Sequence, residues 1–230
     1  MNPKKHPSAS CSVFLAIALL SASPLLAAPT KTITPDLAGI PSEHGWKLVN
    51  RSASVIVKDG GQAIRLEGEG GAGFVRLENF TFADGVIEFD ARGRNVVQQS
   101  FLGIAFHGAD TKTYDAIYFR PFNFQAEDPA RRLHAVQYIS VPVYTWQKLR
   151  KERPNLYEKP VAPVTDPDGW FHVRVVVVSP KVSVFVNNAN EPCLVVDQLS
   201  DRKKGWIALW TDVSGGDFAS LRITPTMKQE

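Results

Sequence analysis

The sequence predicts an all-β protein built from two packed antiparallel sheets, and three observations support this. Sixteen glycines and sixteen prolines stand against only two methionines, a composition that favours strands joined by turns over packed helices. Short runs rich in Val, Ile, Phe and Tyr recur between turn signals. The chain is 44% hydrophobic and 21% charged, which excludes a disordered polyampholyte and a fibrous repeat. We therefore expect a well-formed apolar core.

The first 28 residues are expected to be a secretory signal. Lys4 and Lys5 supply the positive start, an apolar run covers residues 13–26, and cleavage is expected near Ala27 or Ala28. This run is shorter than the roughly 20 residues that a membrane-spanning helix needs. We expect residues 29–230 to form one secreted domain, periplasmic or extracellular, without membrane insertion.

Thirteen strands are expected, too many for a small barrel. Two antiparallel sheets of six or seven strands, a jelly-roll sandwich, accommodate them. The predicted strands cover residues 46–50, 53–57, 63–66, 73–80, 85–92, 100–107, 114–120, 132–139, 170–178, 182–187, 193–196, 205–211 and 218–224.

Two segments show the strand pattern most clearly. In residues 85–92, apolar and polar residues alternate, so one set should face the core and the other water. The first set is Ile87, Phe89 and Ala91, and the second is Glu88, Asp90 and Arg92. Residues 170–178 and 182–187 should form a hairpin across a tight polar turn.

Residues 141–168 lack the recurring pattern of short strands and turns seen in the rest of the chain. The stretch YTWQKLRKERP can form about two helical turns, which Pro154 stops, and Pro160, Pro163 and Pro167 keep the following chain extended. Such a long insertion either borders a binding site or covers the edge of a sheet.

Cysteine usage and charge limit the partners. Cys11 would leave with the signal, so Cys193 is expected to be a buried strand residue without a disulfide. Without Lys4 and Lys5, 24 basic residues face 23 acidic ones, and the formal charge is +1. Because the cations are interleaved with acids, no nucleic-acid partner is expected.

Four strand-and-turn stretches carry a resemblance. GVIEFDARG, FLGIAFHG, WFHVRVVVV with VSVFVNN, and GWIALWTD with FASLRIT together resemble the concanavalin A-like lectin and glucanase superfamily. Within it, the chain is most similar to secreted bacterial laminin G-like or 3-keto-disaccharide hydrolase-like domains. The resemblance implies a jelly roll with a glycan-binding sheet face, and therefore a carbohydrate ligand.

The hypothesis of a glycosidase rests on Glu88 and Asp90. They match the first two carboxylates of the family 16 glycosidase motif, Glu-x-Asp-x-x-Glu, but the third is missing. Two positions apart on a strand, the carboxyl groups can approach the separation that glycoside hydrolysis needs. Arg92 on the same face would keep both ionised, whereas a general acid needs a raised pKa. The alternative is an ion-paired polar strand face.

A denser set of polar and aromatic residues lies between His107 and Glu158. Alternation places Tyr114, Tyr118 and Arg120 on one face of their strand, whereas the face of Gln137 is left open. Such side chains bind sugar hydroxyl groups and pack on their C–H faces. The candidate binding residues are His107, Tyr118, Arg120, Asn123, Gln137, Tyr138 and Trp146. In the alternative reading, the aromatic residues belong to the core and Arg120, expected on the solvent face, pairs with Asp115 or Asp128.

No cofactor is required by any motif. His107 and His134 fit no metal-ligand spacing, and no hydrolytic triad accompanies them. His134 is a catalytic candidate together with Glu88 and Asp90, and Glu158 is the next residue to consider. Asp212 and Asp217, in the turn TDVSGGDF, could offer carboxylates to calcium.

Three functions remain open from the sequence. The first is a secreted domain that binds a glycan on one sheet face. The second is a glycoside hydrolase, family 16-like or 3-keto-disaccharide hydrolase-like, that uses carboxylates near Glu88 and Asp90. The third is an envelope interaction domain without a sugar site. The sequence does not specify the oligomeric state.

Overall fold

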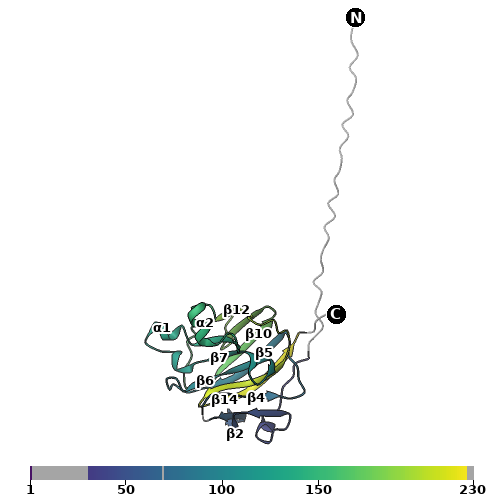
Figure 1. The fold of residues 1–230 in the computed structure, drawn as a ribbon, viewed down its shortest axis with the longest axis vertical. Helices are drawn as coiled ribbons and strands as arrows, with labels where there is room; N and C mark the ends of the chain where they lie inside the picture. The colour runs from purple at the N-terminus through teal and green to yellow at the C-terminus, as the bar shows by residue number, and fades with distance from the viewer. Residues whose placement is uncertain (2–30, 69, 227–230) are drawn as a thin grey trace.

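The protein folds into two seven-stranded antiparallel sheets (Figure 1). The structure is a computed structural model that describes residues 1, 31–68 and 70–226. Sheet I contains, in spatial order, β1 (Trp46–Val49), β4 (Ala72–Leu77), β13 (Trp206–Val213), β6 (Ser100–Asp110), β7 (Thr113–Phe119), β8 (Val136–Val141) and β9 (Glu158–Lys159). Sheet II contains β12 (Leu194–Asp197), β11 (Lys181–Val186), β10 (Phe171–Val178), β5 (Gly85–Arg92), β14 (Gly216–Pro225), β3 (Gly61–Glu67) and β2 (Ser52–Lys58). The predicted two-sheet sandwich is confirmed.

The core lies between the sheets because alternate residues of each strand turn inward. In β5, Ile87, Phe89 and Ala91 are fully buried while the residues between them keep partial exposure, as predicted. Phe119 of β7 meets Phe171 of β10 edge to face, with ring centroids 5.2 Å apart. This contact between the layers defines the faces: Tyr118 on β7 and Arg120, which directly follows β7, project away from sheet II.

Most predicted strand positions are confirmed, but the strand predicted over 132–139 begins later. Pro129–Arg132 form a short helix, α1, whose N-cap Asp128 accepts a hydrogen bond from the Ala130 N–H. A capping Asp followed by Pro at the first helical position favours a helix start. The strand therefore starts at Val136.

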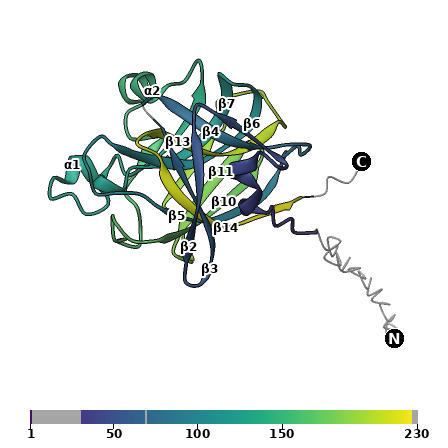
Figure 2. The ribbon, with the colours of Figure 1, turned by 90° about the horizontal axis from the view of Figure 1, so that it is seen from below.

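The 141–168 segment packs against the edge of sheet I. It contains the predicted helix, α2 (Trp146–Glu152), capped by Thr145, and the short strand β9, which pairs with β8. Leu149 and Tyr157 are buried, whereas Trp146 remains 41% exposed. Figures 1 and 2 show α1 and α2 on the side of the sandwich away from β2.

A buried ion pair fastens the segment before β13 to sheet I. The Asp115 side chain is fully buried and accepts hydrogen bonds from Arg202 Nη2 (2.6 Å) and Ser200 Oγ (2.8 Å). Arg202 Nε also donates to the His107 carbonyl oxygen (2.9 Å). Asp115 is therefore paired with Arg202, and the interpretation that Arg120 pairs with Asp115 or Asp128 is wrong.

Cys193 differs from its prediction in one respect. It is a free thiol that is partly buried and directly precedes β12, instead of being a fully buried strand residue. Its Sγ lies 3.4 Å from the Val184 carbonyl oxygen, and burial raises the thiol pKa to about 11. The thiol is therefore a poor nucleophile near neutral pH.

The predicted signal segment, residues 1–28, lies outside the described residues apart from Met1. Within the described ranges, no helix combines the length and apolar character needed to cross a bilayer.

Candidate functional site

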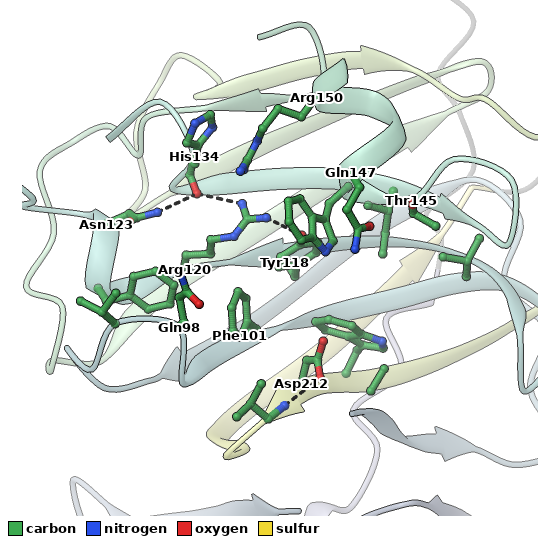
Figure 3. A pocket seen from close by; sticks show the side chains of 18 of the residues that line it. Gln98, Phe101, Tyr118, Arg120, Asn123, His134, Thr145, Gln147, Arg150 and Asp212 are labelled. Atoms are coloured by element: carbon green, nitrogen blue, oxygen red, sulfur yellow. Dashed lines mark hydrogen bonds between the residues drawn. The ribbon is translucent and has the colours of Figure 1, made fainter. Parts of the chain in front are cut away.

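A pocket of about 720 Å³ opens on the outer face of sheet I. Its floor comes from β6, β7, β8 and β13, and α2 forms one wall (Figure 3). This volume is typical of sites for small organic ligands. The polar and ionisable residues lining the pocket are Gln98, Tyr114, Tyr118, Arg120, Asn123, Arg131, His134, Thr145, Gln147, Arg150 and Asp212.

Aromatic rings form the pocket floor. The Tyr118 ring contacts the rings of Phe101 on β6 and Trp210 on β13, with centroids 6.2 and 5.0 Å away. Trp210 Nε1 donates a hydrogen bond to the Tyr114 hydroxyl (3.0 Å). Burial raises the pKa of Tyr118 to about 12, so its hydroxyl stays protonated. Such a floor offers flat apolar surface for the C–H face of a sugar ring.

Arg120 is a buried cation beside this floor. Its Nη2 donates to the Tyr118 hydroxyl and to Gln137 Oε1, both at 2.6 Å, and its Nη1 donates to the His134 carbonyl oxygen at 2.9 Å. Arg120 lies on the outer face of sheet I, as predicted, but the expectation that it is open to solvent there is wrong, because only 5% of the residue is exposed. Burial lowers its pKa, but a guanidinium remains charged at neutral pH.

Glu158 organises the wall next to Arg120. It accepts two hydrogen bonds from Arg150 of α2, at 3.1 and 2.9 Å. His134 Nδ1 lies 2.8 Å from Glu158 Oε2. We call Arg120, Asn123, His134 and Arg150, with Glu158 behind them, the polar end of the pocket.

The helix α2 brings Trp146 and Gln147 to the pocket. The Arg150 guanidinium lies over the Trp146 ring, 5.0 Å from its centroid, in a cation–π contact. This contact is internal to α2, whereas the Arg150–Glu158 pair holds α2 against the polar end. The partly exposed Trp146 ring lines the pocket.

The structure brings most of the predicted binding residues together. Tyr118, Arg120, Asn123 and Trp146 line the pocket. Gln137 is buried next to it and, opposite Tyr118 in the sheet register, accepts hydrogen bonds from Tyr118 and Arg120.

His107 and Tyr138 are not among the lining residues. Tyr138 follows Gln137 on β8 and so takes the opposite face, where its hydroxyl accepts a hydrogen bond from the Leu199 N–H. His107 is fully buried; its Nε2 donates to the Ala83 carbonyl oxygen and its Nδ1 accepts from Gln198. Burial lowers the His107 pKa, which favours this neutral form.

Of the three predicted catalytic residues, only His134 lines the pocket. Glu88 and Asp90 lie on the outer face of sheet II, across the core from it. His172 and Lys58 contact Asp90 at 2.9 and 3.0 Å, and Arg222 lies 3.4 Å from Glu88. Burial raises the pKa of Asp90, but hydrogen bonds from His172, Lys58 and Ser220 outweigh it and hold the pKa well below its usual range.

The two acids considered for calcium lie on different sheets. Asp212 faces the pocket on β13, whereas Asp217 on β14 accepts hydrogen bonds from Arg65 and Arg92. Within the described parts of the chain, no three His, Cys, Asp or Glu side chains gather in a way that could hold a metal ion.

Several pocket residues were not predicted from the sequence, among them Phe101, Arg150 and Trp210. Trp210 lies on β13, which is far from β7 in sequence but only one strand removed from it in the sheet. Phe101 lies on β6, which directly precedes β7 in the chain and pairs with it. The alternation of WIALWTD could have indicated that Trp210 and Asp212 share a face.

Solved structures with related folds are carbohydrate-binding or galectin-like proteins. The chain is similar to the carbohydrate-binding module CBM66 from Bacillus subtilis, at 13% identity and a TM-score of 0.52, covering 78% of this chain and 96% of the other. A Bacillus subtilis protein of unknown function with a galectin-like fold matches at 11% identity and a TM-score of 0.53, covering 84% of this chain and 94% of the other. The lumenal domain of VIP36, bound to Ca²⁺ and Man3GlcNAc, matches at 12% identity and a TM-score of 0.53, covering 81% of this chain and 86% of the other. At these identities the likeness concerns the fold.

The sequence comparisons identify a family. No protein with a curated description matches the chain by sequence. The model of the 3-keto-alpha-glucoside-1,2-lyase-like domain, however, matches residues 41–224, which include every residue of the pocket and all strands of both sheets except the last residue of β14. The chain therefore belongs to the 3-keto-alpha-glucoside-1,2-lyase-like domain family.

Proposed function

We propose that the chain binds a glucoside carrying a ketone at C3 in the pocket of sheet I and cleaves it by elimination across C1 and C2. The family supports the reaction class. The observation that carries the proposal is the buried Arg120 cation beside an aromatic floor, in a pocket with room for a sugar.

The chemistry follows from the ketone. A carbonyl at C3 makes the C2 hydrogen acidic, because the negative charge left by its removal spreads onto the C3 oxygen. The electron pair of the broken C2–H bond then forms a C1=C2 double bond, and the C1–O bond breaks. The glycosidic oxygen takes a proton and leaves as an alcohol. The sugar remains as an unsaturated ketone to which water can add.

The pocket residues suit these steps. A fixed cation in a site shielded from water stabilises a developing oxyanion strongly. We assign this role to Arg120, facing the C3 oxygen. Tyr118 and Trp146 would pack on the sugar ring, and Asn123 and Gln147 would bind its hydroxyl groups. His134, the one histidine among the lining residues, is the proposed proton donor to the departing oxygen.

The site of action would lie outside the cytoplasm if the predicted signal is cleaved. Sequencing the N-terminus of the mature protein from its host tests this; a start near residue 29 is expected, and a mature chain beginning at Met1 contradicts it.

Binding without cleavage is the second candidate. It is supported by the likeness to CBM66 and to VIP36, which was solved with a bound glycan. In this function the pocket would hold a glycan, and Asp212 and His134 would serve as hydrogen-bonding groups.

One assay separates the two candidates. We expect the purified protein to release the aglycone from a 3-keto α-glucoside and to leave the parent α-glucoside, with a hydroxyl at C3, intact over the same period. Product analysis by mass spectrometry and NMR should show the unsaturated ketone or its hydrate. Saturable binding with no product from either compound contradicts the lyase and supports binding alone. Equal cleavage of both contradicts elimination, because the parent lacks the acidic C2 hydrogen.

A further inference from the structure

One acid in the pocket has no role in the scheme above. Among the lining residues that the structure describes, Asp212 is the only carboxylic acid. It lies near the end of β13, two residues after Trp210, so both side chains project from the same face of sheet I. Figure 3 shows Asp212 on the opposite side of the pocket from His134, with Phe101 and Tyr118 between them. A sugar ring over this floor would lie between Asp212 and the polar end.

One oxygen of Asp212 is available to a ligand. Its Oδ1 accepts a hydrogen bond from the Val213 N–H (2.8 Å), and within the described chain no hydrogen bond is assigned to Oδ2. Arg51, whose charge acts on Asp212, makes its hydrogen bonds elsewhere. Arg51 donates to the carbonyl oxygens of Gly71 and Thr211, both at 2.7 Å, and to the Thr211 hydroxyl.

The surroundings of Asp212 favour a base. Burial raises its pKa above the ordinary value, against the hydrogen bond from Val213 and the charge of Arg51. A carboxylate that is less well hydrated than in water takes a proton more readily. Asp90 is the contrast, because its carboxylate is held by Lys58 and His172.

We propose that Asp212 is the general base that removes the C2 proton of the 3-keto glucoside, an assignment that rests on the proposed function. Oδ2 takes the proton, the C2–H electron pair forms the C1=C2 bond, and the C1–O pair leaves with the glycosidic oxygen, which is protonated from the polar end. Asp212 then returns its proton to water. No metal, oxidant or reductant is needed for this balance.

The test uses two substrates that differ in the group that leaves: a methyl 3-keto-α-glucoside, with a poor leaving group, and the 4-nitrophenyl equivalent, with a good one. A base acts on the ring, so Asp212→Asn should lower kcat on both substrates by about 10²–10⁴-fold. Substrate binding, measured by calorimetry, should change little. Asp197→Asn, the same substitution on the exposed strand β12, is the matched control and should keep wild-type turnover.

Each other result overturns this role for Asp212. A loss confined to the methyl glucoside identifies Asp212 as the proton donor to the leaving group. A raised KM with kcat unchanged identifies it as a ligand of sugar hydroxyl groups. Wild-type turnover that survives in a folded Asp212→Asn variant overturns the assignment alone. A wild-type protein that cleaves neither substrate overturns the proposed function, and the assignment with it.

Discussion

Replacing Arg120 by Gln is expected to lower kcat/KM for a 3-keto α-glucoside by about 10²–10³-fold, the usual effect of removing a group that stabilises an oxyanion. Arg120 is the buried cation at the aromatic floor, so its loss removes the charge that would face the C3 oxygen. Steady-state kinetics measure the effect.

Stability must be followed in the same variant. Arg120 donates to Tyr118, Gln137 and the main chain at His134, so its loss leaves buried acceptors less well satisfied, at a cost of about 1–3 kcal/mol. Thermal unfolding identifies the temperature at which the variant is still folded for the assay. Arg120→Lys keeps the charge and should retain part of the turnover. Arg222→Gln, on the outer face of sheet II, is the control. A folded Arg120→Gln variant with wild-type kcat/KM contradicts the role.

Replacing Arg202 by Met is expected to lower the free energy of unfolding by about 3–5 kcal/mol, because it leaves a buried carboxylate without its counter-charge. Asp115 is fully buried, and within the described residues Ser200 would remain as its one side-chain hydrogen-bond donor. Urea unfolding measures the change. Arg222→Met provides the comparison: its partner Glu88 is partly exposed, so the pair should contribute at most about 1 kcal/mol. An Arg202→Met variant within about 1 kcal/mol of wild type contradicts the account of this pair.

The sequence predicts the strands and their faces well, because side chains alternate along any strand. Residues 85–92 and the 170–187 hairpin appear where their patterns place them. The same rule places Tyr118 and Arg120 on one face. Alternation does not determine the face on which Gln137 lies, because that face depends on how β8 pairs with β7 and the local pattern does not specify this pairing.

The errors in the site predicted from the sequence also arise because local alternation does not determine which strands pair. Alternation says that Glu88 and Asp90 point away from the core, but not that β5 lies in sheet II while the pocket lies on sheet I. Trp210 reaches Tyr118 because β13 pairs with β6 on the side away from β7, a pairing between segments far apart in sequence. Phe101 reaches Tyr118 across the local β6–β7 hairpin. Trp146 was predicted from its place on a helix in the insertion, where turn and capping signals are local.

The most direct test of which face acts on the glycoside compares Trp146→Ala, at the pocket, with Glu88→Gln, on sheet II. With a 3-keto α-glucoside as substrate, Trp146→Ala should lower kcat/KM by about 10- to 100-fold, since removing a packed aromatic ring costs roughly 1.5–3 kcal/mol. Glu88→Gln should stay within about twofold of wild type, as expected for a surface substitution. If activity survives in Trp146→Ala and disappears in a folded Glu88→Gln variant, the glycoside binds on sheet II and the proposed site is wrong.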